Sequence, residues 1–334
     1  NGKSATFLKF ILPKFLENTN DATPPPFFAR SPKCAVGLEN MEIIYYTINI
    51  IKSMKSEIIK NNGKTIARVH LPCIEYDSNS SNKAGLISCL SGEIENSDSG
   101  YAGFSTKENL NNYLRETVFD KADDNNRQYI FTLDEVKIIK TVTKAIKKCS
   151  DVLLGGIISI FVFPTFSQFV KKEMSGTTGY TPWPDTILIF INPTSLQYNK
   201  ALSETVGHEF NHTIFLRDKK CVSLLDSIIF EGLAEHFRGQ VIGGDQAPWT
   251  KIFELNQTKI IFSEMKLANL LQSTDPEIRR GVFFGNEKYI CWTGYAIGYY
   301  IVKSFLENNP SLNWKEIMDR QPKDILSESS FSNK

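Results

Sequence analysis

The chain has 334 residues, and this length allows one large domain or two ordinary domains with a substantial core. Its content of 41% hydrophobic and 22% charged residues is typical of a soluble globular protein, and no run of about 18 apolar residues predicts a transmembrane helix. Lysine and arginine number 38 against 37 acidic residues, so the charge balance indicates neither nucleic acid nor an anionic membrane as a partner.

Residues 1–125 are expected to form a smaller, mixed N-terminal region. Within it, residues 64–72 predict a strand, whereas residues 76–105 are rich in Gly, Ser and Asn and indicate a loop. The polar stretch at 120–128 predicts a domain boundary. We therefore divide the chain into residues 1–125, interpreted as a prosegment or a substrate-guiding module, and residues 126–334, which carry the motifs described below.

The signals for secondary structure are clearer in the second part. Residues 132–149 have apolar side chains at helical spacing behind a Thr cap and an acidic first turn, so they predict a helix. Residues 156–164 and 185–193 predict strands, the second of which ends at a proline. The remaining apolar-periodic segments predict helices at 200–216, 223–244, 249–271, 287–307 and 311–319.

The sequence His-Glu-Phe-Asn-His at residues 208–212 indicates a metal-binding site. Residues four apart share one face of a helix, so His208 and His212 can direct both imidazoles at a single metal ion. Glu209 borders that face, where it can reach a water molecule at the metal without being a ligand itself. A helix with two histidines satisfied by protein groups is the alternative. Because a catalytic zinc needs three protein ligands, a third must come from elsewhere in the chain.

Glu231 follows His212 after eighteen residues and stands in a Glu-Gly-x-Ala context. This arrangement resembles the gluzincin metallopeptidases, especially their aminopeptidase branch. The resemblance implies that His208, His212 and Glu231 bind zinc (Zn²⁺) and that Glu209 is the general base. It also implies that Glu235, on the same helix face as Glu231, accepts a hydrogen bond from a ligand histidine and so fixes its tautomer.

Three longer segments of the second part of the chain resemble one particular family. Residues 224–237, 292–306 and 324–331 are similar to a bacterial family of predicted zinc-dependent proteases, the domain of unknown function 2268. The similarity covers about residues 130–331. We expect an α+β domain of zincin type, in which a small sheet with an edge strand lies over two metal-bearing helices and a helical C-terminal lobe follows. The aminopeptidase motif Gly-Ala-Met-Glu-Asn is absent, so the sequence does not decide between an endopeptidase and an exopeptidase.

The sequence just before the metal-binding helix is expected to contact the substrate. Residues 186–192 are interpreted as the edge strand that pairs with an extended peptide, and an ordinary core strand is the alternative. The preceding residues 175–185 contain aromatic side chains and are expected to form a loop on the rim of the cleft.

A hydrolase of this kind needs a hydrogen-bond donor for the oxyanion of its tetrahedral intermediate. Tyr295 and Tyr299 lie four residues apart on one predicted helix, and Gly298 allows that helix to approach a neighbour closely. Tyr295 is the preferred donor because it begins a Tyr-x-x-Gly sequence typical of the family that the chain resembles. Tyr299 and His236 remain alternatives.

The motifs together predict a zinc metallopeptidase that hydrolyses peptide bonds of a peptide or protein substrate. Two other functions compete with this interpretation. A zinc-containing binding or scaffold protein would close its site with a fourth ligand, for which Cys221 and His236 are near in sequence. A hydrolase that acts on other amides or on esters would use the same residues.

The six cysteines are scattered and contain no Cys-x-x-Cys pair, so a four-cysteine zinc site is not supported. Their even number permits disulfides without requiring them. Cysteine usage does not decide the compartment, although a secreted or extracytoplasmic location is favoured over the cytoplasm. The sequence indicates no oligomeric state.

Overall fold

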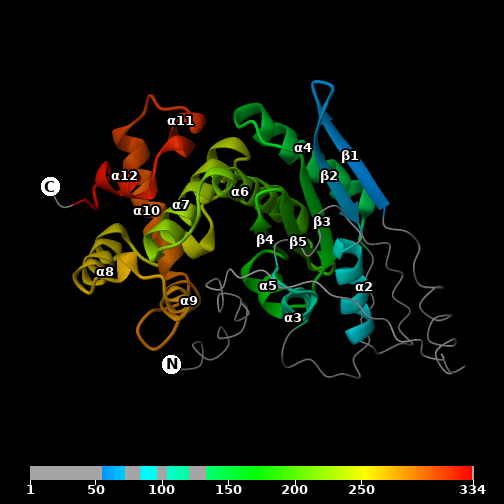
Figure 1. The fold of residues 1–334 in the computed structure, drawn as a ribbon, viewed down its shortest axis with the longest axis horizontal. Helices are drawn as coiled ribbons and strands as arrows, with labels where there is room; N and C mark the ends of the chain where they lie inside the picture. The colour runs from blue at the N-terminus through cyan, green and yellow to red at the C-terminus, as the bar shows by residue number, and fades with distance from the viewer. Residues whose placement is uncertain (1–54, 72–82, 96–103, 120–132, 333–334) are drawn as a thin grey trace, which may run out of the picture.

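A computed structural model describes residues 55–71, 83–95, 104–119 and 133–332. Their strands form one mixed sheet in the order β1-β2-β3-β5-β4 (Figure 1). β1 pairs antiparallel with β2, β2 and β5 each pair parallel with β3, and β4 pairs antiparallel with β5. The strands are β1 (Lys55–Asn61), β2 (Lys64–Leu71), β3 (Ile158–Pro164), β4 (Thr177–Trp183) and β5 (Thr186–Ile191).

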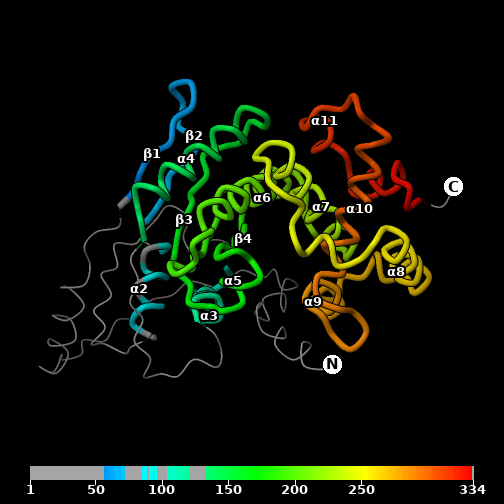
Figure 2. The backbone as a smooth tube through the Cα atoms, turned by 180° about the vertical axis from the view of Figure 1, so that it is seen from behind, coloured from blue at the N-terminus to red at the C-terminus, as the bar shows by residue number. Residues whose placement is uncertain are grey.

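Helices cover both faces of the sheet, and a helical C-terminal lobe lies on the far side of α6 from the strands (Figure 2). This lobe confirms the expectation from the sequence. Within the described residues, no helix is both long and apolar enough to cross a membrane. The helices beside the sheet are α2 (Lys83–Glu95), α3 (Lys107–Val118), α4 (Glu135–Val152), α5 (Gln168–Glu173) and α6 (Tyr198–Asp218). Those that follow are α7 (Leu224–Val241), η1 (Pro248–Thr250), α8 (Leu255–Leu267), η2 (Leu270–Gln272), α9 (Pro276–Phe284), α10 (Thr293–Asn308), α11 (Trp314–Asp319) and α12 (Pro322–Ser327).

The side chains of the central strands alternate between two hydrophobic cores, as the two-residue period of a strand requires. Ile160 and Val162 of β3 belong to the core that also contains buried residues of α4, α6 and α7. Phe161 and Phe163 point to the opposite face and belong to the core formed with α2 and α3. The chain is therefore an α+β protein with a small mixed sheet that is buried on both faces at its centre.

The interpretation of residues 186–192 as the edge strand is wrong. β5 lies between β3 and β4, and all of its residues are buried. A continuous apolar run is the signature of a strand covered on both faces, which is the alternative interpretation of this segment. The edge beside α6 is β4, in which only Thr177 and Thr181 are buried. Thus the segment 175–185, expected to be a loop, contributes the edge strand instead.

The expectation of a loop over residues 76–105 is also wrong for part of that segment, because residues 83–95 form α2. This helix buries Leu86, Ile87, Leu90 and Ile94, which recur at helical spacing. The Ser and Gly residues between them weaken the pattern in the sequence. Docking of this apolar stripe on the phenylalanine face of the sheet outweighs the low helix propensity of those residues.

The N-terminal region contributes strands to the same sheet as the later motifs. β2 pairs in parallel with β3, and Ala67, Val69 and Leu71 are buried in the core shared with α4 and α6. The polar stretch 120–128 lies outside the described residues. The division between residues 1–125 and 126–334 stays a prediction, and the pairing of β2 with β3 bears on whether the second part can fold by itself.

We predict that a fragment of residues 126–334 unfolds at a lower urea concentration than the whole chain. The fragment would leave one edge of β3 unpaired and would expose the apolar surface that β2 covers. Circular dichroism during urea titration of both proteins measures the two midpoints. Equal midpoints would instead support two separable units.

Two glycines bring α7 and α10 into backbone contact. A Cβ atom on Gly232 would lie 2.3 Å from the carbonyl oxygen of Gly298, and a Cβ atom on Gly298 would lie 2.1 Å from the carbonyl oxygen of Ile228. Neither distance can accommodate a side chain. Gly232 follows Glu231, and Gly298 lies one turn after Tyr295, so this contact sets how closely these two candidate site residues approach.

We predict that Gly232→Ala destabilises the protein by about 2 kcal/mol or more, because the new methyl group forces two packed backbones apart. Gly239→Ala is the matched control, since Gly239 lies on the same helix and a Cβ atom placed there would meet no neighbouring atom within 4 Å. The control should be neutral or stabilising by up to about 1 kcal/mol through helix propensity. Chemical denaturation of both variants tests this, and an unchanged free energy of unfolding for Gly232→Ala would contradict the close contact.

Candidate metal centre

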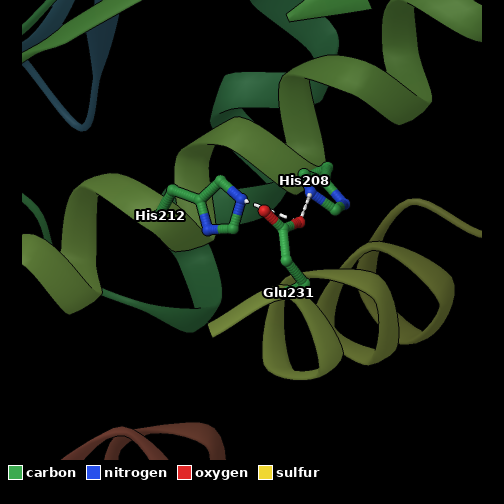
Figure 3. A group of neighbouring side chains, drawn as sticks. All are labelled: His208, His212 and Glu231. Atoms are coloured by element: carbon green, nitrogen blue, oxygen red, sulfur yellow. Dashed lines mark hydrogen bonds and ion pairs between the residues drawn. The ribbon is translucent and has the colours of Figure 1, made fainter. Parts of the chain in front are cut away.

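The candidate metal ligands come from two helices joined by a short connection. The start of α7 is fixed by a capping box, in which the Ser223 hydroxyl accepts the Asp226 N–H at 3.2 Å and the Asp226 carboxylate accepts the Ser223 N–H at 2.8 Å. α6 carries His208 and His212 one turn apart, and both side chains point toward Glu231 on α7 (Figure 3).

The three side chains converge on one point. Glu231 Oε2 lies 3.1 Å from His208 Nε2 and 3.5 Å from His212 Nε2. One donor atom from each of the three residues falls within 4.8 Å of the others. Two imidazole nitrogens and one carboxylate oxygen are a donor set that suits zinc, and three protein ligands leave a fourth position open. The residues present therefore fit the metal that the sequence implies.

Burial and mutual contact shift the protonation of this group. Burial lowers the pKa of His208, but its contacts with Glu231 and Glu235 outweigh burial and raise the pKa to about 10. Burial raises the pKa of Glu231, but His212 and His208 outweigh it and lower the pKa to about 2. These contacts thus favour a protonated His208 beside an ionised Glu231, and a cation that binds to these donors would displace the proton.

His212 is held on its other side by an aromatic ring. The Phe230 ring stacks on the imidazole with a centroid separation of 3.6 Å and an interplanar angle of 10°. Because Phe230 directly precedes Glu231, one turn of α7 both orients His212 and supplies the carboxylate that meets it. The sequence analysis did not identify Phe230, since an aromatic residue at this position is equally typical of a core helix.

Glu235, the residue that the resemblance implies as a partner of a ligand histidine, lies beside His208. Its side chain is buried, and its Oε2 atom is 3.5 Å from His208 Nδ1. Its Oε1 atom accepts a hydrogen bond from the Ala247 N–H at 3.2 Å and another from Arg238 Nη2. Burial raises the pKa of Glu235, but His208 and Arg238 outweigh it and lower the pKa below its usual range. These contacts favour the ionised carboxylate beside the His208 imidazole.

Glu209 contacts the edge strand β4. The Thr181 hydroxyl donates to Glu209 Oε2 at 2.6 Å and to the Glu209 backbone carbonyl at 3.1 Å. A Cβ atom on Gly179 would lie 2.6 Å from Glu209 Cγ, so the glycine makes room for the carboxylate. Glu209 is not a member of the converging donor set. Thr181 and Gly179 lie in the segment expected to be a rim loop, and their contacts with Glu209 depend on a strand pairing that the sequence does not display.

A cleft of about 700 Å³ opens beside the three donors. Residues of β4, α6, α7, α9 and the start of α10 line it, together with residues of α3 and α5. His208, His212 and Glu231 are all in its wall, as is Glu209. The candidate centre is thus part of a cleft large enough for a substrate-sized molecule.

Of the three candidate oxyanion donors, only Tyr295 is part of the cleft wall. Burial raises the pKa of Tyr295 well above its usual value, and the charges of Glu231 and Glu209 raise it further. Its hydroxyl therefore stays protonated and able to donate. Tyr299 instead stacks on His236 with ring centroids 4.5 Å apart, and His236 Nε2 lies 2.9 Å from the Tyr299 carbonyl oxygen.

The two residues considered as a fourth protein ligand do not join the group. Among the described residues, the converging donor set consists of His208, His212 and Glu231 alone. His236 contacts the backbone of Tyr299 on α10. Cys221 is a free thiol in the cleft wall, and burial raises its pKa well above the usual range. Cys149 and Cys291 are also free thiols.

Comparison with known proteins agrees with this geometry. The family described as "Predicted Zn-dependent protease (DUF2268)" matches residues 138–327, which is more than half of the chain. Two uncharacterized proteins of Bacillus subtilis (strain 168) are similar. YjaZ is 28% identical over 142 residues, which cover 41% of this chain and 53% of YjaZ. YjfC is 28% identical over 171 residues, which cover 46% of this chain and 55% of YjfC.

The matched region contains both helices of the candidate metal centre and most of the cleft wall. The alignments span only about half the length of the two curated relatives. With residues 138–327 matched, the chain belongs to the family of predicted zinc-dependent proteases.

Proposed function

We infer that this chain is a zinc-dependent peptidase of gluzincin type, with His208, His212 and Glu231 as the metal ligands. The observation that carries the proposal is the convergence of these three donors in the wall of a cleft, beside a carboxylate that is not one of them. Zinc bound there would supply Lewis-acid activation of a water molecule and of the scissile carbonyl group. The chemistry of the donor set supports this metal over harder cations, which prefer oxygen ligands.

Glu209 is the general base of the proposed reaction. It follows His208 on α6 and therefore lies about 100° around the helix from it, next to the donor set without being a member. The Thr181 hydroxyl donates to one carboxylate oxygen and holds the group in place. The carboxylate takes a proton from the attacking water and passes it to the leaving amine.

Tyr295 is the proposed donor to the oxyanion. It is the candidate that lines the cleft, and it lies near enough to Glu231 and Glu209 for their charges to raise its pKa. A buried, protonated phenol is a preorganised donor that costs no reorganisation as charge develops on the substrate. The contact of Gly232 with Gly298 supports this placement, because it holds the start of α10 close to the metal-bearing helix.

The proposed substrate is an extended peptide or protein segment that lies along β4. β4 ends the sheet as the described residues form it, and residues 177–181 of this strand line the cleft. The backbone groups along an unpaired strand edge can pair with an extended chain. A hydrolase of other amides or esters would use the same donors and base, and only β4 favours the peptide.

We predict that Glu231→Ala lowers zinc affinity by more than about 100-fold. Loss of a residue that only hydrogen-bonds to a metal ligand costs roughly 10–100-fold, and this variant removes a ligand itself. Competition with a chromophoric chelator measures this. Glu277→Ala is the control, since Glu277 also lies in the cleft wall but is paired with Arg280 and is outside the donor set. Wild-type affinity in Glu231→Ala would remove Glu231 from the ligand set.

We predict that Glu209→Gln lowers peptidase activity by about two to four orders of magnitude, the usual contribution of a positioned base. Glutamine keeps the size and can still accept the Thr181 hydrogen bond, but it cannot take up the proton. Zinc content and melting temperature should stay at the wild-type values. Cleavage of peptide, amide and ester substrates should be compared, and near-normal turnover by Glu209→Gln would refute the proposed mechanism.

We predict that Tyr295→Phe lowers kcat by roughly 100- to 1,000-fold, the cost of removing one oxyanion donor, while KM and zinc affinity change little. Tyr299→Phe is the matched control on the same helix, because it removes a hydroxyl outside the cleft and keeps the ring that stacks on His236. Steady-state kinetics on one peptide substrate tests both. Equal losses in the two variants would point to a general disturbance of α10.

A further inference from the structure

Arg238 is a buried residue of α7 that lies seven positions after Glu231 in the chain. The proposed mechanism does not use it. Only 3% of the residue is exposed. Its guanidinium donates through Nη2 to Glu235 Oε1 and through Nη1 to the carbonyl oxygens of Gly243, at 3.2 Å, and Asp245, at 2.9 Å. A buried guanidinium is stable only when its donors are satisfied in this way.

The two carboxylate oxygens of Glu235 contact different parts of the structure. Its Oε1 atom accepts hydrogen bonds from Arg238 and from the Ala247 N–H, while its Oε2 atom lies 3.5 Å from His208 Nδ1. The side chain of Glu235 is therefore anchored at one oxygen and directed at a candidate ligand with the other. Removal of Arg238 would free the carboxylate to rotate away from the imidazole.

The backbone after α7 is built around the guanidinium. Gly243 and Gly244 have φ angles of +92° and +97°, a conformation that L side chains rarely adopt. A Cβ atom on Gly244 would lie 2.2 Å from Glu204 Oε1 and 3.2 Å from Arg238 Nη1. The turn can follow this path only with glycine, and the path brings the carbonyl groups of residues 243 and 245 to Arg238.

The same segment continues into the cleft wall. We define the post-α7 loop as residues 243–249. Its residues Ala247, Pro248 and Trp249 line the cleft, and the Ala247 N–H is the group that donates to Glu235. The buried ion pair of Arg238 and Glu235 thus contacts the post-α7 loop, and its carboxylate also lies beside His208.

We propose that Arg238 is a positioning residue that acts through Glu235, and that it couples the post-α7 loop to the metal affinity of His208. With Arg238 in place, Glu235 is held where it can accept the Nδ1–H of His208, which leaves Nε2 free as the metal-binding nitrogen. The inference rests on the proposed zinc site and requires no particular reaction to take place there.

A double-mutant cycle tests whether Arg238 affects zinc affinity through Glu235. Arg238→Met should lower zinc affinity by about 10–100-fold, the usual cost of losing an outer partner of a ligand. Glu235→Gln should cause a loss of similar size. In the Glu235→Gln background, the additional effect of Arg238→Met should be less than about twofold, because the charged carboxylate through which it acts is already gone. Independent, additive losses would overturn the proposal.

Arg279→Met is the matched control. Arg279 also lies in the cleft wall and also donates to two backbone carbonyl oxygens, those of Cys221 at 3.3 Å and Val222 at 2.9 Å. Unchanged zinc affinity in this variant, beside a loss in Arg238→Met, supports the proposal. Equal losses in the two variants would show a general loosening of the cleft and would overturn it.

Two further measurements keep the test decisive if Arg238→Met does not fold. Arg238→Lys keeps a charge for Glu235 but cannot reproduce the planar fork that reaches both loop carbonyls, so its zinc affinity should lie between those of wild type and Glu235→Gln. In the wild-type protein, zinc should slow hydrogen exchange of the Ala247 amide, and Glu235→Gln should abolish that slowing. Wild-type affinity in Arg238→Lys together with zinc-independent exchange at Ala247 would overturn the coupling.

These readouts are separate from peptidase activity. If the wild-type chain cleaves no substrate but the cycle shows non-additive losses of zinc affinity, the proposed function fails and the positioning role of Arg238 stands. If the wild-type chain is a peptidase and Arg238→Met keeps its zinc affinity, the positioning role alone fails.

Discussion

The carboxylate of Glu231 lies between two imidazoles of the neighbouring helix, at 3.1 Å from one and 3.5 Å from the other, and this contact requires one particular packing of α6 against α7. Charged groups that are largely withdrawn from solvent need partners, since an unpaired charge in the interior is costly. A proton or a metal ion can be shared among all three donors. The apolar residues of the same two helices belong to the main core, so the packing that stabilises the fold also assembles the donor set.

The parts of this centre that the sequence predicted are those set by local geometry. His208, Glu209 and His212 could be placed because the spacing of residues along a helix is fixed. Glu231 could be placed only by resemblance to known metallopeptidases. The eighteen residues that separate it from His212 include the end of one helix, a connection and the start of another, and the length of such a segment does not determine how the helices cross.

The parts that the sequence did not predict depend on pairing between distant segments. The sequence favours β5 as the edge strand because it precedes α6, but the position of a strand in the chain does not give its position in the sheet. Thr181 contacts Glu209 only because β4 turns back beside β5. Likewise, β2 joins β3 across a gap of more than eighty residues in the chain, a pairing that the sequence does not display.

Glycine determines how closely several segments approach the centre. Gly179 leaves room on β4 for the Glu209 carboxylate, Gly232 and Gly298 let α10 touch α7 beside Glu231, and Gly244 leaves room for Glu204 and Arg238. At each position a Cβ atom would lie less than 3 Å from another heavy atom. Interiors are packed so tightly that a single methyl group moves its neighbours, so the backbone at these positions sets the placement of Glu209, of Tyr295 and of the post-α7 loop. Such spacing positions polar groups without adding further buried charges, which would each need a partner of their own.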